Sequence, residues 1–322
     1  MLDIIVPHYK EPWEVGQKLF AMLDLQRGID FGDIHVMIVN DGPEWHLPDE
    51  LFANRPYAVR QLDIPHAGVS AARNAGIDAA TEAWLMFCDF DDTFANVYAL
   101  RDILGVLPAD GIDMLHSDML VEDMTNGNDR LFFSPESQRF VFTHGKVYRR
   151  QFLLDECIRF DETLNFQEDS LFNATIIARV PYQRIGEIKT RIPPYVWIRR
   201  GNSVTNSGRE DEAMFSQFLR NLAVTEENRQ HRSRECYCGM VTRTACDAYY
   251  MMRSTRASNR VKRTILDMFI PWIRERMDAY GQVDEETITK IRDVARAELC
   301  DHPVPDSPED VKRWLDAIAE RR

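Results

Sequence analysis

The chain has 322 residues, of which 44% are hydrophobic and 28% charged, a composition typical of a folded globular protein with room for more than one domain. Its formal net charge of −13 argues against a general nucleic-acid-binding protein, because clustered Lys and Arg must meet the phosphate backbone. No apolar run is long enough to cross a membrane, and no signal peptide is recognised. We therefore expect a cytoplasmic protein, either free or peripheral to the inner face of the membrane.

Short apolar runs alternate with helical periodicities over the first ninety residues. The runs are too short for helices and are bounded by turn residues, so they predict buried strands. Strands that alternate with helices indicate a parallel sheet with crossover helices. The expected strands are 2–6, 34–39, 59–64 and 84–88, and the expected helices are 14–25 and 69–80.

The same α/β character continues to about residue 200, and the chain then becomes helical. The next expected elements are helices 98–107 and 149–156, a helix that follows the polar entry 165–169 and runs to about Ala178, and strands 114–121, 185–188 and 195–198. Five helical patterns follow, at 215–224, 238–252, 261–277, 285–299 and 308–319. We therefore expect two domains, 1–207 and 208–322, with a boundary near Ser207: an α/β domain with a mostly parallel sheet and a C-terminal all-helical appendage.

The acidic group Asp89, Asp91 and Asp92 directly follows the apolar run 84–88. It therefore falls at the carboxyl end of an expected strand, the edge where open α/β sheets bind ligands. Clustered carboxylates repel one another, and a divalent cation that prefers oxygen ligands would relieve the repulsion. A solvated acidic turn is the alternative interpretation.

Polar loops also follow the first two strands. Tyr9 and Glu11 lie in the first loop, and Asp41 lies in the second. In a parallel sheet such loops are neighbours, and an aromatic ring beside carboxylates suits a nucleotide. For either loop taken alone, an ordinary strand-to-helix connection is the favoured interpretation.

Arg73 lies in a stretch of small residues, Gly68 to Gly76, that is expected to form a helix. A guanidinium among such neighbours needs an anionic partner, and a diphosphate or a loop carboxylate would serve. Glu168 and Asp169 precede an amphipathic helix, where acids commonly favour the helix dipole. The functional alternative is a general base that deprotonates an attacking hydroxyl.

Two further groups carry weaker signals. His144 and Lys146 would meet a phosphate or metal if their loop faced the acids, and a solvated loop is the alternative. Tyr195 and Trp197 precede the pair Arg199–Arg200. They would stack a sugar and hold a phosphate, or they form a core strand followed by a basic loop.

These motifs, in this order, resemble the family 2 glycosyltransferases of the GT-A fold. The matching segments are Ile-Val-Pro-His-Tyr-Lys-Glu at 5–11, Val-Asn-Asp-Gly at 39–42, the Gly68–Gly76 stretch, Asp-Phe-Asp-Asp at 89–92 and Phe-Gln-Glu-Asp at 166–169. The chain departs from the family pattern at His8, Lys10 and Pro43. The resemblance covers about residues 1–205, and the absence of a Gln-x-x-Arg-Trp motif argues against a processive polysaccharide synthase.

The resemblance implies a nucleotide-diphospho-sugar donor, most often a UDP-sugar, with Mn²⁺ or Mg²⁺, and an acceptor hydroxyl on a glycan or cell-surface polysaccharide. It implies that Asp169 is the catalytic base, that Asp92 approaches the metal with support from Asp89, and that the anomeric configuration inverts. The donor-binding positions that it implies are Pro7, Tyr9, Glu11, Asp41, Arg73 and Asp91. It does not cover the C-terminal helices, which we expect to cover the acceptor side, to form a homodimer, or to rest on a membrane surface.

Two rival functions remain at this stage. Asp89 to Thr93 also fits the Asp-x-Asp-x-Thr signature of haloacid-dehalogenase-like phosphatases, in which Asp89 would be the nucleophile and Asp91 the acid. The three strands expected before it carry motifs that a phosphatase does not explain. The other rival is a catalytically inactive module that binds a nucleotide-sugar or glycan, and the intact set of acids argues against it.

Overall fold

The computed structural model describes residues 1–107, 110–125, 129–135, 141–201, 209–301 and 306–320. The chain divides into two compact units, Met1–Ser207 and Gly208–Arg322, each with its own hydrophobic core. The residues at the boundary expected near Ser207, together with the rest of 202–208, lie outside the described residues. Each unit is described separately below.

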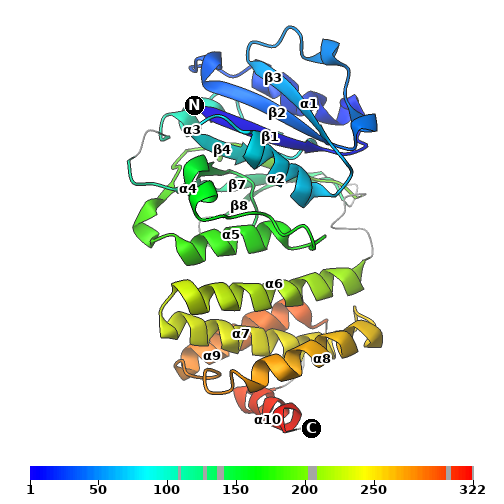
Figure 1. The fold of residues 1–322 in the computed structure, drawn as a ribbon, viewed down its shortest axis with the longest axis vertical. Helices are drawn as coiled ribbons and strands as arrows, with labels where there is room; N and C mark the ends of the chain where they lie inside the picture. Colours follow the sequence, from blue (N-terminus) through cyan, green and yellow to red (C-terminus); the bar gives the residue numbers. More distant parts are fainter. Residues whose placement is uncertain (108–109, 126–128, 136–140, 202–208, 302–305, 321–322) are drawn as a thin grey trace. The chain divides into compact units, whose positions relative to one another are not determined.

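A seven-stranded sheet forms the centre of the first unit (Figure 1). Its strand order is β10-β6-β9-β4-β1-β2-β3, and only β9 among these seven runs antiparallel to its neighbours. The strands are β1 (Leu2–His8), β2 (Ile34–Asp41), β3 (Ala58–Ile64), β4 (Trp84–Phe87), β6 (Met114–His116), β9 (Lys146–Arg149) and β10 (Ile185–Glu187). The predicted mostly parallel α/β fold is confirmed.

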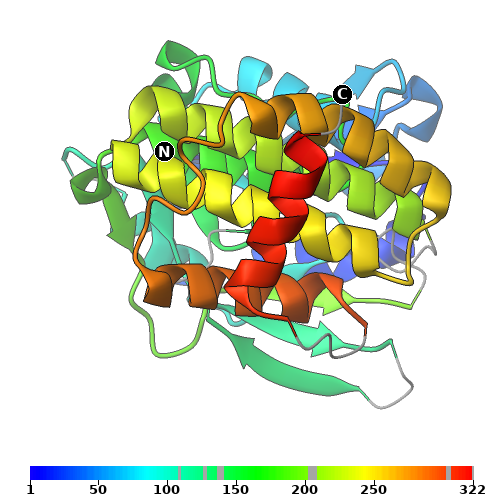
Figure 2. The same cartoon turned by 90° about the horizontal axis from the view of Figure 1, so that it is seen from below.

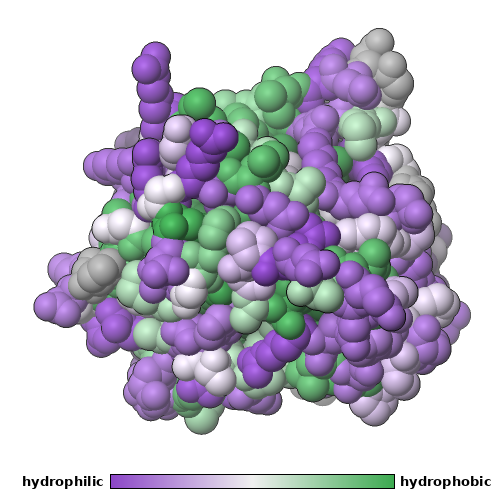
Figure 3. Space-filling model, turned by 90° about the horizontal axis from the view of Figure 1, so that it is seen from above, coloured by the Kyte–Doolittle hydropathy of each residue, from purple (hydrophilic) through white to green (hydrophobic). Residues whose placement is uncertain are grey.

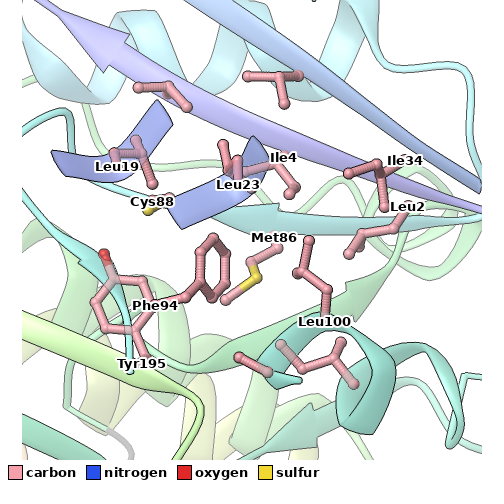
Figure 4. Packing of buried hydrophobic residues seen from close by; sticks show 14 of the residues in the cluster. Leu2, Ile4, Leu19, Leu23, Ile34, Met86, Cys88, Phe94, Leu100 and Tyr195 are labelled. Atoms are coloured by element: carbon pink, nitrogen blue, oxygen red, sulfur yellow. The ribbon is translucent and has the colours of Figure 1, made fainter. Parts of the chain in front are cut away.

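Helices cover both faces of this sheet, which is why its central strands read as continuous apolar runs. Alternate residues of β1 enter different cores. Ile4 packs with Leu19 and Leu23 of α1 (Trp13–Asp24) and with Leu100 of α3 (Ala99–Leu104), as Figure 4 shows. Ile5 belongs to the opposite core. That core also takes side chains from α2 (Val69–Ala79), α4 (Arg150–Asp155) and α5 (Glu168–Arg179).

A smaller second sheet adjoins the first core, with strand order β5-β11-β7-β8. Its strands are β5 (Thr93–Phe94), β7 (Met119–Asp123), β8 (Arg130–Ser134) and β11 (Tyr195–Arg199). The single strand predicted over residues 114–121 is wrong, because the chain changes sheet at Ser117 and Asp118 and forms β6 and β7. Both β8 and β9 were missing from the sequence prediction.

The segment between β6 and β9 begins and ends at one point of the large sheet. His116 pairs with Lys146 across β6 and β9, and the Ser117 amide and hydroxyl both donate to the Gly145 carbonyl at 3.0 Å. Gly145 has φ 66°, and a Cβ there would lie 2.6 Å from Ser117 Oγ. Glycine is therefore required at this closure on two independent grounds.

The second unit is helical within the part that the structure describes, as the sequence predicts. Its helices are α6 (Glu210–His231), α7 (Arg234–Arg253), α8 (Asn259–Arg274), α9 (Glu285–Leu299) and α10 (Pro308–Ala319). Helix α7 contacts each of the other four, and α10, drawn in red in Figure 2, lies across them. None of the described helices combines the length and the apolar character needed to cross a membrane.

Hydrophilic side chains cover most of the face shown in Figure 3, and apolar ones lie between them in small groups. The outer strand β8 is different, because three consecutive apolar residues of this strand, Leu131, Phe132 and Phe133, are all exposed. Since β8 is the edge strand of the small sheet, this apolar triplet lies on a strand that has one unpaired backbone edge.

We predict opposite stability effects for the same change in two helices. A Cβ at Gly76 of α2 would lie 2.4 Å from Cγ2 of Ile5 on β1, so Gly76→Ala should destabilise the first unit by about 1–3 kcal/mol. Gly239 of α7 has open space, so Gly239→Ala should stabilise the protein by about 0.4–1 kcal/mol. Thermal unfolding followed by circular dichroism measures both, and equal melting temperatures for the two variants would contradict the packing argument.

Candidate active site

The polar loops identified from the sequence meet at one edge of the large sheet. The parallel strands β1, β2 and β4 all end there, so their following loops are neighbours. The antiparallel strand β9 begins at this edge, because Val147 pairs with Met86 near the end of β4. Residues that precede β9 therefore join residues that follow the parallel strands.

Asp92 is the most enclosed of the three acids, with a side chain only 1% exposed. Its Oδ2 accepts a 2.6 Å hydrogen bond from the Tyr195 hydroxyl, and its Oδ1 accepts one of 2.8 Å from the Ile198 amide. Burial, followed by the charges of Asp89 and Asp91, raises the pKa of Asp92 well above its ordinary value. Strand β11 thus fixes this carboxylate in a position where its negative charge is unfavourable without a cation.

Asp89 lies between a guanidinium and an imidazole. Arg73 Nη2 donates to its Oδ1 at 3.1 Å, and His144 Nε2 lies 3.3 Å from its Oδ2. Burial opposes ionisation, but Arg73 and then His144 outweigh it and hold the pKa of Asp89 well below its usual range. Asp91 pairs instead with Arg200, and burial together with Asp89 raises the pKa of Asp91.

One ligand atom from each of Asp89, Asp92 and His144 lies within 4.8 Å of the other two. The imidazole is buried and stacks on Tyr195 at a centroid distance of 5.2 Å, and its Nδ1 has no hydrogen-bond partner among the residues that the structure describes. The sequence singled out His144 only weakly, because its importance depends on β9 running antiparallel. The donor set of two carboxylates and one imidazole suits a divalent cation.

Asp41 shapes the loop that leads into α2. Its two oxygens accept hydrogen bonds from the Ala67 amide at 2.7 Å and the Gly68 amide at 2.9 Å, and His66 Nδ1 lies 2.8 Å from Oδ2. Gly68 has φ 96°, a backbone conformation that favours glycine. The structure therefore uses this acid to hold the turn before the Arg73 helix.

The first loop places an aromatic stack above the carboxyl end of β1. The Tyr9 ring lies parallel to the His66 ring, with centroids 4.3 Å apart, and Lys10 Nζ lies 4.5 Å from the Tyr9 ring centre. Glu11 accepts a 3.2 Å hydrogen bond from the Tyr9 amide, and burial raises the pKa of Glu11. Pro7 is the penultimate residue of β1 and pairs with β2.

Asp169 lies in the first turn of α5, beside Glu168. The preceding Gln167 adopts a left-handed conformation with φ 65°, a costly geometry for a residue with a Cβ. Asp169 is half-buried, and burial, followed by the charge of Glu168, raises its pKa to about 7. Glu168 turns to Arg73, whose Nη1 donates to its Oε1 at 3.0 Å.

Other candidates from the sequence lie near the acids but have structural roles. Tyr195 and Lys146 are fully buried, so neither offers a surface to a sugar or phosphate, and the ligand interpretation of these two residues is wrong. The Tyr195 hydroxyl acts on Asp92 instead. Trp197 is half-buried beside Phe142, and Arg199 pairs with Asp123.

Comparison with known proteins decides the family. Residues 3–156 match the family described as glycosyl transferase family 2. Residues 3–156 therefore carry a glycosyl transferase family 2 domain, which spans a little under half of the chain. This agrees with the resemblance inferred from the motifs. The phosphatase alternative built on Asp89 is left without support.

Two curated glycosyltransferases are similar to part of the chain. An uncharacterized glycosyltransferase, EpsJ of Bacillus subtilis, is 27% identical over 234 residues, which are 64% of this chain and 63% of that protein. The poly(ribitol-phosphate) beta-N-acetylglucosaminyltransferase TarS of Staphylococcus aureus is 30% identical over 179 residues, 52% of this chain and 30% of that protein. The chain thus spans less than two thirds of either relative.

A solved structure of residues 1–349 of S. aureus TarS in complex with UDP has the same fold. The TM-score is 0.65 at 18% sequence identity, and the match covers 99% of this chain and 90% of that one. At this identity the likeness concerns the fold, which agrees with the GT-A architecture expected from the sequence.

Proposed function

We propose that this protein is an inverting, metal-dependent glycosyltransferase that moves a sugar from a UDP-sugar to a hydroxyl of a cell-surface polysaccharide. The names of two relatives support this acceptor class: TarS glycosylates poly(ribitol-phosphate), and GgaA of Bacillus subtilis is a minor teichoic acid biosynthesis protein. The donor class is supported by TarS structures in complex with UDP and with UDP-GlcNAc.

Two features on either side of Arg73 carry the proposal. One is a cluster of side chains suited to bind a cation, and the other is a carboxyl group with a pKa of about 7. Asp89, Asp92 and His144 form the first group, and Asp169 is the second. A transferase needs both, because one side must stabilise a departing diphosphate and the other must take a proton from the acceptor. Arg73 contacts Asp89 and the neighbour of Asp169.

The chemistry of the donor set fits a divalent cation. Two carboxylates that repel each other line the cluster, and His144 Nε2 lies 3.3 Å from Asp89 Oδ2 and 3.5 Å from Asp92 Oδ2. Mg²⁺ prefers all-oxygen ligands, so the imidazole favours Mn²⁺. When bound, the cation would neutralise charge on the leaving diphosphate. Asp89, Asp92 and His144 would hold it.

On the acceptor side, Asp169 would act as general base. The acceptor oxygen attacks the anomeric carbon as its proton passes to Asp169, and the bond from that carbon to the diphosphate oxygen breaks, with the electron pair leaving on the diphosphate. One displacement inverts the anomeric configuration. A carboxyl of pKa about 7 is well matched to this task near neutral pH.

The donor side would be formed by the first loop and the middle acid. Tyr9 would flank the base, Pro7 and Glu11 would contact the nucleoside, and Asp91 would reach the ribose or sugar. Asp41 would act through the turn that it holds. We assign donor binding and catalysis to residues 1–207. We propose that the helical unit either covers the acceptor side or forms the contact between two subunits.

The metal dependence can be tested by UDP binding. Wild-type protein should bind UDP at least tenfold more tightly in Mn²⁺ than in EDTA. Asp92→Asn and His144→Ala should each lose most of this difference, because the first removes a carboxylate charge and the second an imidazole ligand of the cluster. Isothermal titration with UDP measures it. Asp123→Asn, which alters an acid of β7 outside the cluster, is the control and should keep the wild-type difference. Equal UDP affinities with Mn²⁺ and EDTA in the wild type would refute the metal assignment.

The base assignment is tested by Asp169→Asn. This change keeps the size of the side chain but removes its ability to take a proton. Transfer should fall by roughly 10²–10⁴-fold while donor affinity stays within a few-fold of wild type. Glu168→Gln should be milder, because Glu168 contacts Arg73. UDP release from a panel of UDP-sugars, with poly(ribitol phosphate) as acceptor, gives the rates. A near wild-type rate for Asp169→Asn would remove Asp169 from the mechanism.

The pH dependence follows from the same group. The base must be deprotonated, and burial and Glu168 place its pKa at about 7, with Asp89 also raising it and Arg73 lowering it. The turnover number should therefore rise about tenfold per pH unit below this pKa and level off above it. Glu168→Gln should move the rise to lower pH. A turnover number independent of pH between 5 and 8 would contradict the assignment.

A further inference from the structure

Arg73 of α2 joins two carboxylates that lie far apart in the sequence. Its Nη2 donates to Asp89 Oδ1 at 3.1 Å and its Nη1 donates to Glu168 Oε1 at 3.0 Å, across sequence separations of 16 and 95 residues. Asp89 follows β4 and Glu168 begins α5. One guanidinium therefore connects the acidic cluster to the helix that carries Asp169.

The surroundings of Arg73 fix its guanidinium in place. The side chain is only 5% exposed, and its guanidinium carbon lies 5.2 Å from the centre of the Phe160 ring. Burial disfavours the charge, but Asp89 and then Glu168 outweigh it and hold the pKa of Arg73 above its ordinary value. Planar fork geometry lets a guanidinium hold two carboxylates at a set separation, which a single ammonium does not do.

We propose that Arg73 is a positioning residue that sets the spacing between the cation-binding carboxylates and the proton acceptor, and that Glu168 is its anchor on α5. This inference rests on the proposed function. It differs from the role implied by the family resemblance, in which Arg73 holds the nucleoside. A side chain that is 5% exposed and paired with two carboxylates has little surface left for a donor.

The geometry gives Asp89 two separate tasks. Its Oδ1 is taken by Arg73, and its Oδ2 faces His144 in the cluster. Any shift of Arg73 therefore moves both ends of the site: Asp89 after β4, and the first turn of α5 through Glu168. Misplacement of reacting groups by about 1 Å costs on the order of 100-fold in rate, so a small change at Arg73 should affect turnover more than binding.

The test separates turnover from donor affinity. Arg73→Lys keeps the charge but loses the fork. It should lower the turnover number by roughly 10- to 100-fold for the UDP-sugar that the wild type uses fastest, with UDP affinity in Mn²⁺ changed less than threefold. Glu168→Gln should act in the same direction with a smaller loss. The double variant should lose little more than Arg73→Lys alone, because both changes break one connection.

The matched control is Arg159→Lys. Arg159 pairs with Asp78 at the surface, outside the site, and this change should leave both turnover and UDP affinity unaltered. Arg73→Ala adds a second readout, because it leaves a guanidinium-sized space. Guanidinium chloride at millimolar concentration should restore part of the turnover of Arg73→Ala and none of the loss in Asp169→Asn.

Three results would overturn the inference. Wild-type turnover in Arg73→Lys would do so, and so would a loss of UDP affinity that accounts for the whole defect, since Arg73 would then be a donor ligand. Strict additivity of Arg73→Lys and Glu168→Gln would be the third. If Arg73→Lys does not fold, as judged by circular dichroism, a fully active Glu168→Gln also overturns it. A wild-type protein without turnover on any UDP-sugar would instead refute the proposed function.

Discussion

Repulsion among the carboxylates at the end of β4 governs the rest of the first unit. Asp89, Asp91 and Asp92 lie within four consecutive positions, and two of the three have raised pKa values. Each has a different compensation: Arg73 for the first, Arg200 for the second, and a tyrosine hydroxyl with a backbone amide of β11 for the third. These partners come from α2, from β11 and from the residue after β11. The helix, the small sheet and the end of β4 must therefore be assembled together before the charges of the three acids are compensated.

Much of this arrangement was predictable from the sequence, for a physical reason. Parallel strands covered on both faces must be apolar throughout, so β1, β2 and β4 stand out as runs, and the polar residues after them fall at one edge. This reasoning does not find strands that are exposed or very short. Strand β8 is exposed and β9 has only four residues with a cation at each end, so neither gives a clear signal. The run at 114–121 hides a change of sheet at Ser117. Likewise His144 precedes its strand, and the pairing of Arg73 with Glu168 depends on tertiary structure.

Two residues of the site have strained backbone conformations that the surrounding fold must stabilise. Lys10 and Gln167 both have left-handed backbones, with φ 66° and 65°, although neither is glycine. Such geometry costs about 1–3 kcal/mol per residue and persists only when surrounding structure fixes it. Lys10 belongs to the loop with Tyr9, and Gln167 immediately precedes Glu168 and Asp169. Two separate segments of the site are thus held away from their preferred conformations by the fold.

The closure between Ser117 and Gly145 has a consequence for how this architecture can diversify. Because the chain leaves and rejoins the large sheet at hydrogen-bonded neighbours, the intervening excursion resembles an inserted cassette, whose length can change at a small entropic cost without shifting the flanking strands. The cassette ends at the residue next to His144 and includes β8 with its exposed Phe132. His144 and the pairing of β7 with β11 belong to this segment, so only its outer part, strand β8, can vary while the acids at the catalytic edge keep their partners.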